Sequence, residues 1–146
     1  MRLHEIQSNL LTIVRSVTEL AAVQSQVVID DGNKAIESEN ALTDKGISLL
    51  IMAPECLGVN SQGQGATSLV YASTVWVRTN PKVTVNGAAK WDPCLIESKI
   101  IPKVLQFGSE PINFFQIPDG LEPEVDWTDV GLNSRLIRFA TTIILQ

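Results

Sequence analysis

Hydrophobic and polar residues alternate most regularly along residues 133–146 of this chain. Arg135 and Ile137 fall on one side of an extended backbone, and Leu136 and Arg138 fall on the other. A period of two, rich in β-branched residues, predicts a β-strand. This strand exceeds the usual length of about 3–10 residues. We therefore expect a sheet that is completed across a subunit boundary.

Other strands are predicted where alternation or an apolar run ends in turn residues. The clearest is Ser68–Thr79, and the others are Gln26–Ile29, Gly46–Ala53, Lys82–Val85 and Pro111–Ile117. The dipeptide Asn86-Gly87 is typical of a tight hairpin turn. By contrast, Lys34–Lys45 and Gly58–Thr67 are polar and show neither the strand nor the helix period. We expect both segments to be exposed, mobile loops.

Two helices are predicted from apolar residues at helical spacing, over residues 3–15 and Asp92–Phe107. Asp92-Pro93 has the order preferred at a helix start. Pro102 lies inside the second helix and should kink or split it at Ile101, because its ring clashes with the preceding turn.

A short further turn of helix is expected between the first helix and the strand at Gln26. Ser16 and Glu19 have the spacing of a capping box, and the turn should run through about Ala22.

The order of these elements indicates one α+β domain of 146 residues. We expect a curved, mainly antiparallel sheet packed against two helices. The net charge of −5 and the scattered basic residues argue against a nucleic-acid binder. No apolar run approaches the length of a membrane span, and no secretory signal is recognised at the N-terminus.

Catalytic and metal-binding patterns are weak in this sequence. His4 is the single histidine, and Cys56 and Cys94 are far apart, so we expect a solvated histidine and reduced, structural thiols. Asp30-Asp31-Gly32-Asn33 is better explained as a turn than as a calcium loop, because the closing glutamate is absent. Gly58, Gly63 and Gly65 lack the Lys-Ser/Thr pair of a phosphate-binding loop. We expect no enzyme activity, cofactor or metal.

The acidic residues Glu122, Glu124, Asp126 and Asp129 surround Trp127. A solvated linker is favoured over a metal or acid–base cluster, and an acidic rim that orients a neighbouring subunit is a third possibility.

Trp76 is either a core residue or an interface anchor. The candidate interface set is Trp76, Glu122, Glu124, Asp126, Trp127, Arg135 and Arg138.

The order of elements resembles the tail terminator, or tail completion, family of tailed phages and prophages. The resemblance rests on the N-terminal helix and short turn, the strand that ends in Asp30-Asp31-Gly32, and the helix Asp92–Phe107. It also includes the long strand SLVYASTVWVRT and the C-terminal strand SRLIRFATTIIL.

This resemblance implies a structural protein of the virion tail that is assembled in the bacterial host cytoplasm. It would form a homo-oligomeric ring, commonly of six subunits, that caps the tail tube and contacts the tail tube protein and the head connector protein. A head–tail joining protein and a small monomeric ligand-binding or enzymatic α+β domain remain alternatives.

Overall fold

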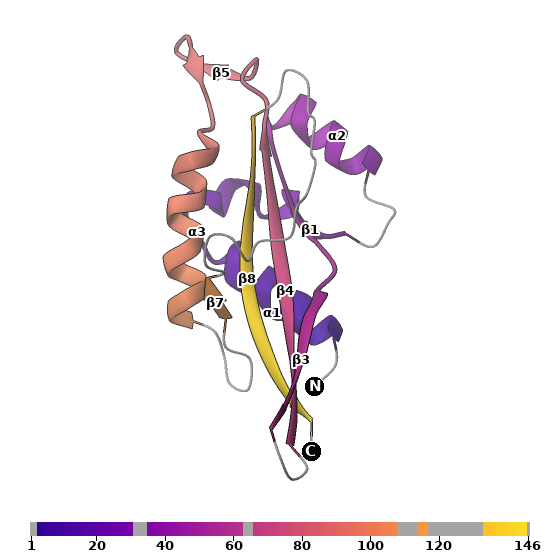
Figure 1. Ribbon diagram of the computed structural model, residues 1–146. Helices are drawn as coiled ribbons and strands as arrows, with labels where there is room; N and C mark the ends of the chain where they lie inside the picture. Colours follow the sequence, from indigo (N-terminus) through magenta and orange to yellow (C-terminus); the bar gives the residue numbers. More distant parts are fainter. Residues whose placement is uncertain (1–2, 31–34, 63–65, 108–113, 117–132, 146) are drawn as a thin grey trace.

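The computed structural model describes residues 3–30, 35–62, 66–107, 114–116 and 133–145. Within them the protein is an α+β fold with a mixed, mostly antiparallel sheet, as the sequence predicts (Figure 1). The helices are α1 (Leu3–Arg15), a 3-10 helix η1 (Thr18–Gln26), α2 (Ala35–Asp44) and α3 (Pro93–Phe107). The strands are β1 (Val27–Ile29), β2 (Ile47–Ile51), β3 (Glu55–Gln62), β4 (Ala66–Thr79), β5 (Thr84–Val85), β6 (Ala88–Ala89), β7 (Phe114–Gln116) and β8 (Asn133–Leu145).

The strand β4 organises the main sheet, whose order is β1-β2-β4-β8-β7. On one side β4 pairs with β8 from Thr67 opposite Leu145 to Thr79 opposite Asn133. On its other side β4 pairs first with β3 and then with β2. These pairs are antiparallel, whereas β1 and β2 run parallel. The two long strands predicted from alternation are therefore confirmed, and they are direct neighbours.

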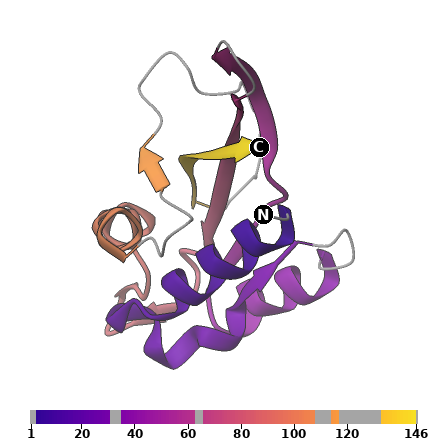
Figure 2. The same cartoon turned by 90° about the horizontal axis from the view of Figure 1, so that it is seen from below.

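The main core lies between one face of the sheet and the helices α1, η1 and α3. Buried side chains of α1 and α3 form one cluster with inward side chains of β2, β4 and β8. Leu49 and Val77 illustrate the register, because they are paired across β2 and β4 and are both fully buried. Figure 2 shows α1 and α3 gathered beside the strands. The amphipathic helix predicted for residues 3–15 is confirmed, and its apolar face supplies much of this core.

The prediction of a mobile loop at Lys34–Lys45 is wrong, because most of this segment is the helix α2. The helix connects β1 to β2, and a parallel pair requires such a crossover connection. Ala41 and Leu42 are buried, and Ser48 and Arg78 contact α2 from the sheet face opposite to Leu49. These contacts with distant residues stabilise a helix whose own sequence has little helical periodicity.

The prediction of a second loop at Gly58–Thr67 is also wrong, because its described residues belong to β3 and β4. Pairs run from Glu55 opposite Ala72 to Gln62 opposite Ala66, with a register shift between Cys56 and Gly58. Backbone hydrogen bonds with β4 hold β3 in place although its polar, glycine-containing sequence does not alternate.

The predicted capping box is wrong as well. The Ser16 hydroxyl donates to the carbonyl oxygen of Ile13 at the end of α1 and does not cap the next helix. The residue before η1 is Val17, which makes no side-chain cap, and η1 continues beyond Ala22 to Gln26. The short helix itself was predicted correctly, but Ser16 ends the preceding helix.

Helix α3 begins as predicted, with the Asp92 carboxylate accepting a 3.0 Å hydrogen bond from the backbone N–H of Cys94. Of the predicted kink or split at Ile101, the split does not occur, and α3 is one helix from Pro93 to Phe107. Pro102 has no N–H, so the carbonyl oxygen of Ser98, four residues earlier, receives no helical hydrogen bond. Both residues are exposed, so water can bind that oxygen.

A small hairpin of β5 and β6 precedes α3 and has the predicted turn, with Asn86 and Gly87 both at positive φ. The solvated linker favoured for the acidic residues around Trp127 lies outside the described residues. Of the strand predicted at Pro111–Ile117, the structure describes β7.

Candidate interaction surface

The long strands run past the helices and form a projecting part of the sheet, which we call the three-stranded extension (Figure 1). It consists of β3, residues 66–72 of β4 and residues 140–145 of β8. In the view of Figure 2 the β3–β4 hairpin also points away from the group of helices. The extension is held by backbone pairing on both sides of β4, so it is a continuation of the sheet.

Both outer strands of this extension present a backbone edge. Among the described strands, β3 pairs only with β4. On the other side, β7 pairs with β8 only at residues 139–141, so no described strand pairs with the outer edge of residues 142–145. Within the described residues, the three-stranded extension therefore has two edges whose backbone N–H and C=O groups pair with no other strand, and such edges can bind a further strand.

The two edges carry almost none of the residues that usually block strand pairing. Strand β3 contains one charged residue, Glu55, and no proline or lysine, and residues 142–145 are Thr-Ile-Ile-Leu. Leu57, at the register shift of β3, is 41% exposed. Proteins commonly protect edges with charge, proline or bulges, and on the described edges only Glu55 and the local bulge near Cys56 are of this kind.

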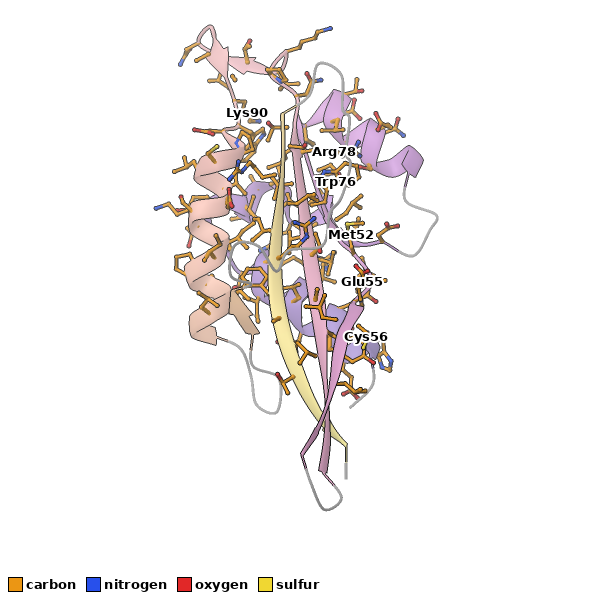
Figure 3. The ribbon with its side chains drawn as sticks, viewed as in Figure 1. Met52, Glu55, Cys56, Trp76, Arg78 and Lys90 are labelled. Atoms are coloured by element: carbon orange, nitrogen blue, oxygen red, sulfur yellow. The ribbon has the colours of Figure 1, made fainter. Side chains whose placement is uncertain are left out.

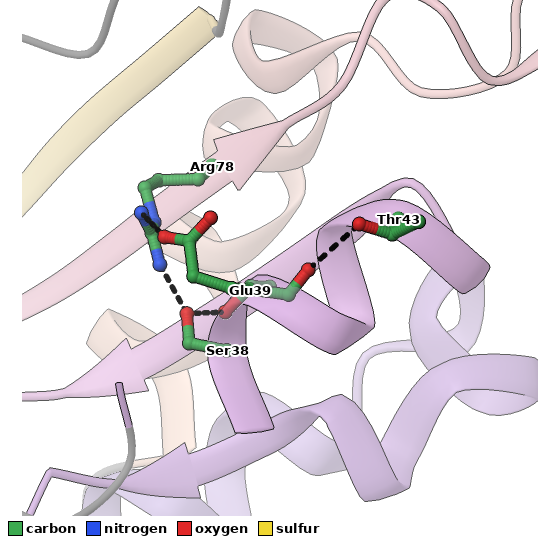
Figure 4. A network of polar contacts seen from close by, with 5 residues as sticks. Ser38, Glu39, Thr43 and Arg78 are labelled. Atoms are coloured by element: carbon green, nitrogen blue, oxygen red, sulfur yellow. Dashed lines mark hydrogen bonds and ion pairs between the residues drawn. The ribbon is translucent and has the colours of Figure 1, made fainter. Parts of the chain in front are cut away.

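Apart from the strand edges, a polar cluster lies on the face of the sheet that carries α2 (Figure 3). The Arg78 guanidinium lies 4.3 Å from the centre of the Trp76 ring and pairs with Glu39 at 3.0 Å. It also donates to the hydroxyl of Ser38, which lies 2.7 Å from that of Ser48 (Figure 4). Arg78 is buried whereas the Glu39 side chain is mostly exposed. This cluster joins α2 to the sheet, and Trp76 is a half-buried member of it.

The predicted interface residues Arg135 and Arg138 lie on opposite faces of β8. Arg135 is paired across the sheet with Val77, and Arg138 with Thr74. The Nε of Arg135 donates a 2.6 Å hydrogen bond to Glu97 on α3. This hydrogen bond, and the charge of Glu97, raise the pKa of Arg135 above its ordinary value. Arg135 is thus engaged within its own subunit, while its side chain stays 48% exposed.

The structure brings Trp76 and Arg138 onto the same face, on neighbouring strands, because Trp76 opposes Leu136 and Thr74 opposes Arg138. Arg138 is half-buried. The remaining predicted interface residues, Glu122, Glu124, Asp126 and Trp127, lie outside the described residues.

The residues considered for chemistry are dispersed. His4 is exposed on α1, and Cys56 and Cys94 are free and exposed on different elements. The described residues contain no group of three or more histidine, cysteine or acidic side chains that could hold a metal ion. Among the same residues, no helix is long and apolar enough to cross a membrane.

Comparisons with family models, curated proteins and solved structures find no match to this chain. The structural class that the fold defines is α+β. The main feature that sequence reasoning missed is the edge of β3. The absence of charge and proline in residues 56–62 was the available signal, but without β4 as a partner it was interpreted as a loop.

Proposed function

We propose that this chain is a structural protein of a tailed phage or prophage that forms a ring on the tail tube and joins the tail to the head connector. It acts in the virion tail after assembly in the bacterial host cytoplasm. Its partners are further copies of itself, the tail tube protein and the head connector protein. It works without catalysis.

The observation that carries this proposal is the three-stranded extension, two edges of which pair with no strand among the described residues. The helices and the apolar core on one face hold the domain together, whereas the extension projects beyond them (Figure 1). A ring needs a different surface on each side of every subunit, so that the contacts close on themselves. The β3 and β8 edges supply two such surfaces. The order of elements, which resembles the tail terminator family, agrees with this role.

Native mass spectrometry of the purified chain over a range of concentrations, with electron microscopy of the same samples, tests the proposal. We expect a closed oligomer that electron microscopy shows as a ring. If it does not form alone, it should form when the cognate tail tube protein of the proposed phage or prophage is added. A chain that stays monomeric at high concentration and with that tube protein would exclude this function and favour a small monomeric domain.

Electron microscopy of rings mixed with tail tubes or head connectors distinguishes a tail terminator from a head–tail joining protein. A tail terminator ring should bind the end of preformed tail tubes, where electron microscopy can locate it. Rings that bind isolated head connectors but leave tube ends free would instead identify a head–tail joining protein.

A further inference from the structure

The two edges of the three-stranded extension have a fixed relative direction. Both β3 and β8 are antiparallel to β4, so they run parallel to each other. Gly58 of β3 and Thr142 of β8 are both paired with Val70 of β4, and they therefore lie at the same level of the extension. This geometry restricts how two copies can join edge to edge.

We infer that residues 142–145 of β8 in one copy pair in parallel with residues 58–62 of β3 in the next copy. This inference rests on the proposed function, because it names the contact that would close the ring. A rotation axis along the strands preserves strand direction, so it brings a β8 edge beside a parallel β3 edge. A two-fold axis across the strands would instead pair β3 with β3, antiparallel.

The parallel arrangement is favoured because it uses both edges of every copy. A two-fold β3–β3 dimer would leave the uncharged β8 edge of each copy unpaired, and such edges promote further association. A closed head-to-tail ring leaves no edge of the extension without a strand. The bulge of β3 lies between Cys56 and Gly58, so the register beyond Gly58 is regular enough to accept a neighbour.

The partner is a second copy of this chain and not an unrelated strand, because the two edges complement each other in length and level. Each is an uninterrupted stretch that begins at the row containing Val70 and continues toward the end of the extension. The contact is small for a stable pair of proteins, which usually bury about 1,200–2,000 Å² in total. Closure around a ring, where each copy is held at two edges, compensates for this small area.

Exposed leucines provide a test of the surface. Leu57 on β3 is 41% exposed and Leu105 on α3 is 43% exposed, so the two are matched in accessibility but lie on different elements. Leu57→Lys places a charge directly beside the proposed pairing at residues 58–62 and should raise the concentration for half-assembly at least tenfold. Leu105→Lys should change it less than twofold. If Leu105→Lys has the larger effect, α3 forms the interface and the inference is wrong.

Disulfide crosslinking tests the direction of pairing. The native thiols are both exposed, so the background variant is Cys56→Ser with Cys94→Ser. Gly58→Cys is well suited, because a Cβ at Gly58 meets no atom within 4 Å, and Thr142 is exposed on the same row. In this background, we compare Gly58→Cys alone, Thr142→Cys alone and both together, in the full chain under mild oxidation. Val85→Cys with Thr142→Cys is the control, because Val85 is exposed on the distant β5–β6 hairpin.

We expect a ladder of crosslinked oligomers only from the Gly58→Cys/Thr142→Cys variant, on a denaturing gel without reductant. Crosslinked dimers from either single variant, or an equal ladder from the control, would overturn the parallel pairing. Native mass spectrometry of the same samples tests the proposed ring separately from the proposed contact between β8 and β3. A ring that gives no ladder overturns this interface and leaves the proposed function standing, whereas a monomer overturns both.

Discussion

The hydroxyl oxygens of Ser38 on α2 and Ser48 on β2 lie 2.7 Å apart, and both side chains are buried. Ser38 also accepts a hydrogen bond from Arg78 of β4. One small side chain therefore connects the crossover helix to two neighbouring strands. A buried donor that loses its partner retains the cost of its desolvation, so this contact should matter more than its size indicates.

Ser38→Ala should lower the free energy of unfolding by about 1–3 kcal/mol, because it leaves Ser48 and the Arg78 guanidinium each without one partner. Urea unfolding followed by circular dichroism measures this change. Thr43→Ala is the matched control on the same helix, since Thr43 is exposed and bonds only to the Glu39 carbonyl oxygen. Because alanine is the better helix former, propensity alone would stabilise both variants, and a Ser38→Ala protein no less stable than Thr43→Ala would show that the buried network contributes little.

Gly46→Ala should destabilise the fold by more than about 1 kcal/mol, because the backbone there has a positive φ that alanine adopts poorly. A Cβ at this position would also lie 2.8 Å from the Cβ of Val83. Gly58→Ala is the control, with no atom within 4 Å of the added carbon. Adding Val83→Ala to Gly46→Ala relieves the clash but not the backbone strain, and should recover only part of the loss. Thermal unfolding of these three variants and the wild type decides, and an unchanged Gly46→Ala protein would contradict this account.

Pro102→Ala should raise the free energy of unfolding by about 1–3 kcal/mol, because it restores a helical N–H and removes the clash of the ring with the preceding turn. Pro102 is exposed in the middle of α3, so the smaller side chain leaves no buried cavity. Leu105→Ala, an exposed site on the same helix, should change stability by less than about 0.5 kcal/mol. A Pro102→Ala protein no more stable than the wild type would mean that α3 has adapted fully to the proline.

If charge on half-buried Arg138 orients a neighbouring subunit, as the proposed ring requires, Arg138→Glu should weaken assembly while leaving the domain folded. Exposed ion pairs contribute only about 0–1 kcal/mol, so a change in alignment should accompany a modest loss of affinity. Light scattering reports assembly and circular dichroism reports folding. Lys82→Glu makes the same change of charge at an exposed site near the β5–β6 hairpin and should have little effect. Unfolding of Arg138→Glu would instead assign Arg138 to the fold of the monomer.

The elements that could be predicted from sequence are those whose own residues carry the signal. The alternation in Ser68–Thr79 and the apolar stripe of residues 3–15 identified β4 and α1 correctly, since each buries one regular face. The helix α2 was missed because Ser38 and Leu42 are stabilised by residues far away in the chain.

Strand β3 was missed for a related reason, since its hydrogen bonds are made with β4. The candidate surface depends on strand edges, which follow from topology and not from residue type. For that reason the arginines of β8 could be selected from sequence, whereas the edge at Gly58 could not.

The pairing of β4 with β8 has a consequence for how the chain folds. It joins Thr67 to Leu145 and Thr79 to Asn133, which are distant in sequence, so a large loop must close before any of these contacts forms. The β3–β4 hairpin and the β1-α2-β2 crossover are local by comparison and should form first. We therefore expect slow refolding, limited by the docking of β8, during which β4 lacks its neighbour and dilution improves the yield of native protein.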